Sequence, residues 1–163
     1  HFTAKVYRRG ESIYHASLTQ AFTGHGGDDW RLRTIQALVK PVALTAPPTR
    51  PLQELFAALP KRPVARVYVT EGGRLLAWLD PREVLAQFNN KQLAPDATVA
   101  SVARPVSFAL TPDMPLSAAL EGFLREQATV LPVTPDQWRN TLLGEVSRHD
   151  LLLAIQDRMT YPK

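Results

Sequence analysis

An internal repeat constrains the fold of this chain more than any other feature of its sequence. The segment KPVALTAPPTRPLQELF at 40–56 matches RPVSFALTPDMPLSAAL at 104–120 with an offset of 64 residues. Three extra residues in the loop PDQWRN then change the offset to 67, so that LLAWLDPREVL at 75–85 corresponds to LLGEVSRHDLL at 142–152. A match over ~50 residues with one small slip indicates the duplication of a structural unit.

Each copy predicts the same order of elements. A short strand leads through a turn to a proline at the first position of a helix, Pro51 or Pro115. Apolar residues then recur at helical spacing, and two valine-rich strands and a final helix follow. In the first copy, Gly72 and Gly73 supply the positive φ angles of a tight hairpin. The expected strands are 42–44, 65–69, 75–79, 106–108, 130–134 and 142–146, and the expected helices are 51–59, 81–88, 115–126 and 148–158.

These elements predict an α/β (α+β) fold of two β-α-β-β-α repeats related by a pseudo-twofold axis, with an N-terminal helical linker. Units of about 55 residues are too small to form a comfortable core alone, so the two repeats are expected to pack together. We place the helix and linker at 1–33, the first repeat at 34–91 and the second at 97–160. A short helix, capped by Asp28 or Asp29, is expected to run through Trp30 towards Val39.

The order of elements resembles a tandem pair of cystathionine-beta-synthase (CBS) domains, a Bateman module. The resemblance is carried by the paired PV…P-L openings, by VLPVT at 130–134 and by LLGEVSRHDLLLAI at 142–155. It extends over about 38–158. It implies a regulatory module that is not an enzyme.

In CBS pairs that bind adenine nucleotides, a Gly-x-apolar-Ser/Thr-x-x-Asp/Asn motif lies at the last strand-to-helix turn. Here it stands as Gly144, Val146, Ser147 and Asp150. The helix N-terminus offers free N–H groups and a positive dipole end to phosphate, and the Ser147 hydroxyl can join them. Asp150 can accept hydrogen bonds from both ribose hydroxyls, while Gly144 lets the backbone approach a ligand closely.

Two further residues of this turn, Arg148 and His149, could add positive charge beside a phosphate. The same spacing is also that of a capping box, in which Ser147 and Asp150 only start the helix. Both interpretations stay open at this point.

The family resemblance implies that the other repeat completes the cleft. The matching positions are Val42, Ala43, Val64 and Ala65. Their small apolar side chains suit the flanks of an adenine ring, and they suit a plain core equally well.

The corresponding turn of the first copy departs from the motif. It reads AWLDPRE, with Ala77, Asp80 and Glu83 in place of the glycine, serine and aspartate. Asp80 before Pro81 is a strong helix start, but it puts negative charge where a phosphate would lie. We therefore interpret this second cleft as structural.

The first thirty residues indicate a host. The phrase ESIYHASL at 11–18 resembles the segment that follows the last membrane helix in bacterial CLC-family chloride channels and chloride/proton antiporters. The alternative is an arbitrary amphipathic helix that docks on the pair. TGHGGDDW at 23–30 lacks the strand–helix frame of a phosphate loop and predicts a flexible linker.

Composition excludes several classes of function. The 19 basic and 15 acidic residues give a net charge of +4, but the basic residues are scattered, which argues against nucleic acid as a partner. The chain has no cysteine for a disulfide, a thiolate metal site or a cysteine nucleophile. No apolar run approaches the ~20 residues that span a bilayer. We expect no catalytic residue and no metal site.

The sequence thus predicts the cytoplasmic regulatory CBS pair of a CLC-type channel or antiporter, at the inner face of the cell membrane. Because the chain begins with His1 rather than Met, it looks like a piece of a longer protein whose transmembrane chloride-transport domain is missing. A homodimer and an adenine nucleotide ligand (ATP, ADP or AMP) are expected, with no required cofactor. The alternatives are the sensor of a cytoplasmic enzyme or transcription regulator, and a purely structural dimerisation module.

Overall fold

The structure is a computed structural model, and it describes residues 30–160. The amphipathic segment 2–22 and nearly all of the glycine-rich stretch 23–30 lie outside the described residues. The features expected there stay predictions.

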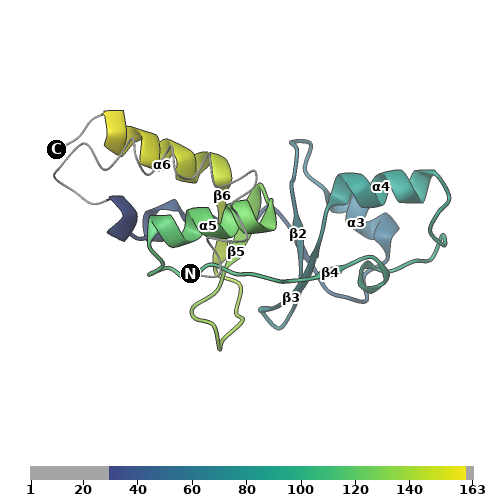
Figure 1. Ribbon diagram of the computed structural model, residues 1–163. Coiled ribbons are helices and arrows are strands. Elements are labelled where there is room, and N and C mark those ends of the chain that lie inside the picture. Colours follow the sequence, from purple (N-terminus) through teal and green to yellow (C-terminus); the bar gives the residue numbers. More distant parts are fainter. Residues whose placement is uncertain (1–29, 161–163) are drawn as a thin grey trace.

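The described chain forms two lobes, one for each repeat (Figure 1). The first repeat contains β1 (Thr45–Ala46), α3 (Leu52–Ala58), β2 (Val67–Glu71), β3 (Arg74–Leu79) and α4 (Pro81–Asn89). The second contains β4 (Arg104–Pro105), α5 (Leu116–Glu126), β5 (Val130–Val133), β6 (Gly144–Ser147) and α6 (Arg148–Thr160). Short 3-10 helices lie at η1 (Trp30–Leu32), η2 (Gln36–Leu38) and η3 (Val99–Ser101). The predicted mixed α/β fold of two repeats is confirmed.

The helices form where the sequence predicts them because one face of each can be buried. Their apolar residues recur at intervals of three and four positions, which places them on one side of the helix. The buried residues are Leu52 and Leu55 in α3, and Leu116, Ala119, Leu120, Gly122, Phe123 and Leu124 in α5.

The two prolines that precede these helices stand one position earlier than predicted. Pro51 and Pro115 have extended backbones, with ψ of 144° and 152°, and act as N-caps rather than as the first helical residues. The reason is that each first helical residue donates its N–H to a carbonyl of another segment, which a proline could not do. Leu52 N donates to Ala97 O at 2.9 Å, and Leu116 N donates to Arg33 O at 2.6 Å.

The hairpin between β2 and β3 agrees with its glycines. Gly72 and Gly73 have φ of 59° and 82°. Because these angles are free of strain only in glycine, the pair closes β2 directly onto β3, with Glu71 opposite Arg74.

The predicted opening strands at 42–44 and 106–108 are wrong. The chain pairs with its own repeat only a few residues later, at β1 and at a single bridge in the second repeat. The parallel pairs join Ala46 to Val69 and Leu110 to Val133. Each member of one pair lies 64 residues from its counterpart in the other, so the repeat in the sequence is also a repeat in the strand register.

The first strand of each repeat begins later than predicted because the residues just before it pair with the other repeat. β4 opens the second repeat but pairs with β3 of the first, with Arg104 opposite Trp78, at the edge of the sheet β1-β2-β3-β4. Lys40 opens the first repeat but pairs with Glu145 in β6, which forms a two-stranded sheet with β5. Lys40 and Arg104 are equivalent in the repeat, as are Glu145 and Trp78, so the exchange is pseudo-symmetric.

Buried apolar residues gather in two clusters, one in each lobe. The cluster of the first repeat includes Leu52, Leu55, Val67, Val69, Leu79 and Val84. That of the second includes Leu116, Leu120, Phe123, Leu131, Val146 and Leu151. The repeats are therefore joined mainly by exchanged backbone and by the polar contacts described below.

Residues 30–38 pack against the second repeat. Trp30 and Ile35 belong to its apolar cluster. The helix predicted from Trp30 towards Val39 is wrong: the chain makes the two short turns η1 and η2 instead. An uninterrupted helix is prevented because Thr34 bridges Pro115 between the turns and Ile35 N donates to Met114 O at 3.0 Å.

Candidate functional site

The turn from β6 into α6 has the geometry of a helix cap. Ser147 Oγ accepts a hydrogen bond from Asp150 N at 3.0 Å, which occupies one of the N–H groups left open at a helix start. Arg148 N donates to Thr129 O at 2.8 Å, so the turn is also tied to the preceding loop. The capping interpretation of the motif is correct for Ser147, and it leaves the Asp150 carboxylate available for another partner.

That partner is Lys40, a residue that the sequence did not single out. Its Nζ lies 2.7 Å from Asp150 Oδ2, and the two side chains are 52% and 30% exposed. The hydrogen bond from Lys40 holds the pKa of the Asp150 carboxyl below its usual range. We call Lys40, Glu145, Ser147 and Asp150 together the Asp150 site.

Gly144 lies directly against the backbone of the segment that opens the first repeat. A Cβ atom at this position would lie 2.6 Å from the carbonyl oxygen of Lys40 and 2.9 Å from Val39 Cγ1. The close approach that requires glycine is therefore made by the chain's own backbone, where Lys40 and Glu145 exchange hydrogen bonds of 2.9 and 3.0 Å.

The small apolar residues expected beside an adenine ring are divided between two environments. Ala43 and Val64 pack in the apolar cluster of the first repeat. Val42 and Ala65 are half-buried. The pairing of Lys40 with Glu145 brings the segment that leads to Val42 beside β6, so the two repeats do meet here.

A buried polar contact joins the repeats next to this site. Tyr68 OH donates to Glu145 Oε2 at 2.7 Å, and the Tyr68 side chain is fully buried. Burial raises the pKa of Glu145, while the hydrogen bond from Tyr68 and the charges of Arg66, Lys40 and Arg62 act in the opposite direction. The charges of three cations thus act on one half-buried carboxylate.

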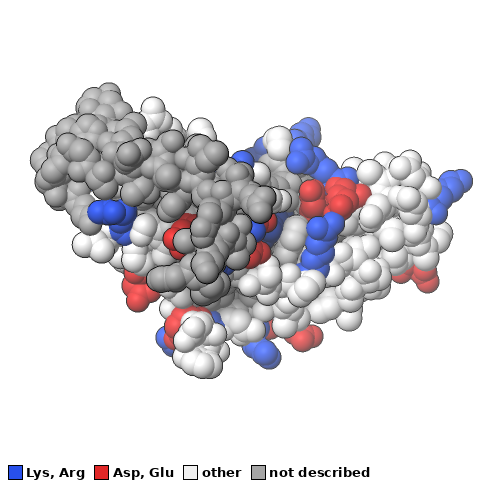
Figure 2. Space-filling model, viewed as in Figure 1, with Lys and Arg blue, Asp and Glu red and all other residues white. Residues whose placement is uncertain are grey.

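Side chains of both signs gather where the two lobes of Figure 1 meet (Figure 2). The Arg66 guanidinium stacks on Trp78 at 3.6 Å from the ring centroid, and burial lowers its pKa. Of the other predicted site residues, Arg148 is half-buried and His149 is exposed.

The corresponding turn of the first repeat starts α4 as predicted. Asp80 Oδ1 accepts hydrogen bonds from Arg82 N at 3.0 Å and Glu83 N at 3.5 Å. Glu83 forms an ion pair with Arg104. Since Glu83 and Arg104 are the repeat equivalents of Asp150 and Lys40, the same ion pair occurs twice.

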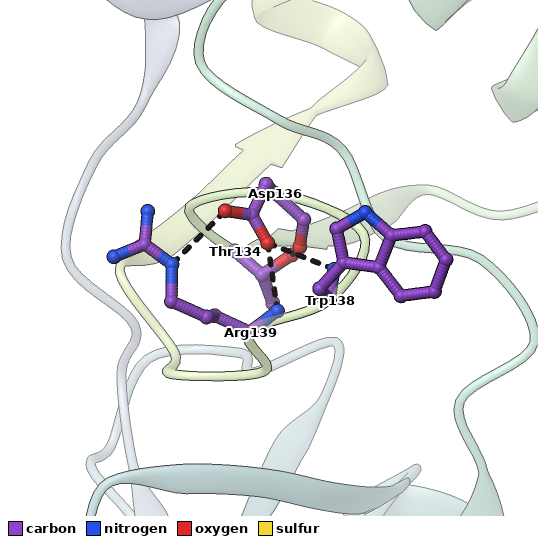
Figure 3. A network of polar contacts seen from close by, with 4 residues as sticks. All are labelled: Thr134, Asp136, Trp138 and Arg139. Atoms are coloured by element: carbon purple, nitrogen blue, oxygen red, sulfur yellow. Dashed lines mark hydrogen bonds and ion pairs between the residues drawn. The ribbon is translucent and has the colours of Figure 1, made fainter.

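The loop that interrupts the repeat forms a hydrogen-bonded turn around Asp136 (Figure 3). Asp136 Oδ1 accepts from Trp138 N at 2.8 Å and from Arg139 N at 2.7 Å, while Arg139 Nε donates to Oδ2 at 2.9 Å. These bonds hold the pKa of Asp136 below its usual range. The Trp138 side chain is 83% exposed at the rim of a groove of about 770 Å³, which Asp150 and Lys40 do not line.

Within residues 30–160, no group of His, Cys, Asp and Glu side chains could hold a metal ion. No helix described there is long and apolar enough to cross a membrane.

Comparison with known proteins identifies a family that part of the chain matches. Residues 95–157 match the family model of the CBS domain, which covers the second repeat. No curated protein matches the sequence. Solved structures match both repeats together.

Three of these structures show the kinds of protein that the chain resembles in fold. CBSX2 in complex with AMP is 19% identical, with 76% of this chain and 96% of that chain covered and a TM-score of 0.62. The CBS domain of a CBS domain-containing membrane protein from Sphaerobacter thermophilus is 15% identical, with 88% and 96% covered and a TM-score of 0.60. The CBS domains of a transcriptional regulator from Streptococcus pneumoniae are 17% identical, with 75% and 98% covered and a TM-score of 0.60. At these identities the likeness establishes the fold, that of a tandem CBS pair.

Proposed function

We propose that this CBS pair is a regulatory module, without catalytic activity, that binds an adenine nucleotide at the Asp150 site. The observation that carries the proposal is the position of the Asp150 carboxylate. It lies on the first turn of α6, in an ion pair with Lys40 from the segment that opens the other repeat. CBSX2, which has the same fold, was solved with AMP.

Each part of a nucleotide has a suitable partner in this proposal. The Asp150 carboxylate accepts hydrogen bonds from the ribose hydroxyls, and the half-buried Val42 and Ala65 flank the base. Phosphate oxygens are attracted by the N-terminal end of α6, a helix of 13 residues, and by Arg148 and His149. Gly144 has no direct role, because its open side faces Lys40.

Calorimetric titration with ATP, ADP and AMP tests the proposal. We expect the parent chain to bind at least one of them and Asp150→Ala to bind about tenfold to a hundredfold more weakly, since a hydrogen bond to a charged group contributes about 1.5–3 kcal/mol. Glu83→Ala is the matched control, because it removes the equivalent carboxylate from the other repeat. It should bind like the parent.

Two results would count against nucleotide binding. One is the absence of both heat and a thermal shift with millimolar nucleotide. The other is equal binding by the parent and by Asp150→Ala. In either case the turn only caps α6, and the module serves assembly.

We propose a CLC-type chloride channel or antiporter as the host, with the module at the cytoplasmic face of the inner membrane. The support is the phrase ESIYHASL at 11–18. Apolar membrane helices encoded upstream of His1 in the gene are the expected finding. A catalytic barrel or a DNA-binding domain there would favour the alternative, a sensor of an enzyme or transcription regulator.

A homodimer is part of the same proposal. Sedimentation equilibrium of the purified chain should give twice the mass of 18.1 kDa at micromolar concentration. A nucleotide could then change the arrangement of repeats or subunits, but only by the difference in its affinity for the two arrangements. A monomer at all concentrations would remove dimerisation from the proposal.

A further inference from the structure

We infer that Lys40 makes the Asp150 site selective for ligands that carry a phosphate, by exchanging its carboxylate partner for the phosphate when the ligand binds. The inference rests on the proposed function and names a residue that sets its specificity. It starts from the ion pair between Lys40 Nζ and Asp150 Oδ2, which joins the two repeats at 2.7 Å.

The backbone of Lys40 is fixed, while its side chain can move. Both of its backbone polar groups are bonded to Glu145, at 2.9 and 3.0 Å. The side chain, in contrast, is 52% exposed. An exposed ion pair contributes little to stability, so a ligand can displace the ammonium from Asp150 at small cost.

Displacement leaves the ammonium in a cationic environment. Lys40, Arg62 and Arg66 all act on the same carboxylate, Glu145, and that carboxylate is already bonded to Tyr68. Once a ribose occupies Asp150, Lys40 has lost its own carboxylate partner and shares Glu145 with Arg62 and Arg66, of which Arg66 is also attracted by Glu126. A neutral nucleoside would leave the Lys40 ammonium without a paired anion, whereas a nucleotide brings a phosphate that can take the place of Asp150 as the partner of Lys40.

The position of Lys40 suits this exchange. Its ammonium lies against the first turn of α6, because Asp150 N is itself bonded to Ser147 Oγ at 3.0 Å. A short movement of the side chain would therefore keep the ammonium beside the turn at which the phosphate is proposed to bind. In the other repeat, Arg104 is paired in the same way with Glu83, but its guanidinium also lies over Trp78, at 5.4 Å from the ring centroid.

The test compares AMP and adenosine, which differ only in the phosphate, by calorimetry on the parent and on Lys40→Met. We expect the parent to prefer AMP. Lys40→Met should bind AMP about tenfold more weakly, as the loss of one hydrogen bond between charged groups predicts, and adenosine as well as or better than the parent does. Lys40→Arg should restore the preference for AMP. Arg104→Met, the matched change in the other repeat, should keep it.

The outcomes separate this inference from the function on which it rests. If the parent binds neither AMP nor adenosine, the proposed function fails and the inference fails with it. If the parent binds AMP and folded Lys40→Met keeps the parent's ratio of AMP to adenosine affinity, nucleotide binding stands and the role of Lys40 is overturned. Equal melting temperatures of parent, Lys40→Met and Lys40→Arg establish that the variants are folded.

Discussion

Replacing Gly144 by alanine is expected to destabilise the fold by about 3 kcal/mol, because the new methyl group has no space. Its Cβ would lie 2.6 Å from the Lys40 carbonyl oxygen and 2.9 Å from Val39 Cγ1. A backbone carbonyl cannot rotate out of the way, so the pairing of Lys40 with Glu145 has to open. Each hydrogen bond lost there adds about 1 kcal/mol to the strain. Urea denaturation, with the slope of the transition compared between variants, measures the effect.

Gly122→Ala is the control for this substitution. Gly122 is also buried, but the atoms that a Cβ would meet belong to the ring of Phe108 rather than to backbone. The half-buried ring can shift, and alanine is a better helix former than glycine by about 1 kcal/mol. We expect a change of less than about 1 kcal/mol for this variant. Equal destabilisation by the two substitutions would mean that the Lys40 backbone does not constrain position 144.

Much of the fold could be predicted from the sequence because its determinants are local or repeated. The helical spacing of Leu116, Leu120 and Phe123 and the glycines at 72 and 73 each act through nearby residues. Because each element occurs in both copies, two segments of the sequence support each assignment. The offset of 64 in the sequence reappears in the parallel pairs of the structure.

The errors occur where a segment is held by the other repeat. The strand expected at 42–44 is displaced because Lys40 is already paired across to Glu145. Pro51 stands outside its helix because Leu52 N is bonded to Ala97 O. Neither partner can be identified from the local pattern that places a strand or a helix.

The candidate site also has one part that local sequence predicts and one part that it does not. The capping role of Ser147 follows from the spacing within a single turn. The role of Lys40 does not follow from local spacing, because Lys40 lies 110 residues before Asp150. Its one sequence signal is that basic residues open both copies, KPV at 40–42 and RPV at 104–106, and this gains meaning only when the exchange of opening segments is known.

The contact between Tyr68 and Glu145 is the side-chain contact between the repeats whose loss we expect to cost most. Tyr68→Phe removes the hydroxyl that donates to Glu145 Oε2 and leaves a half-buried carboxylate with one partner fewer. At pH 7 the variant should be less stable than the parent by about 2–3 kcal/mol, the range for a hydrogen bond to a buried charged group. Chemical denaturation measures the difference.

The pH dependence of that difference identifies its cause. Burial raises the pKa of Glu145 in the folded chain, so the folded state binds more protons than the unfolded state. Stability therefore falls as the pH rises from the ordinary pKa of a glutamate to the raised pKa of Glu145. The Tyr68 hydrogen bond lowers this pKa, and its removal raises the pKa further. The penalty of Tyr68→Phe should therefore shrink at pH 4, towards the ~1 kcal/mol of a neutral hydrogen bond. Glu145→Gln is the control, because it keeps a hydrogen-bond acceptor without the charge. In that background the Tyr68→Phe penalty should be small and independent of pH. A penalty of the same size in the Gln background would instead assign the effect to packing around the ring.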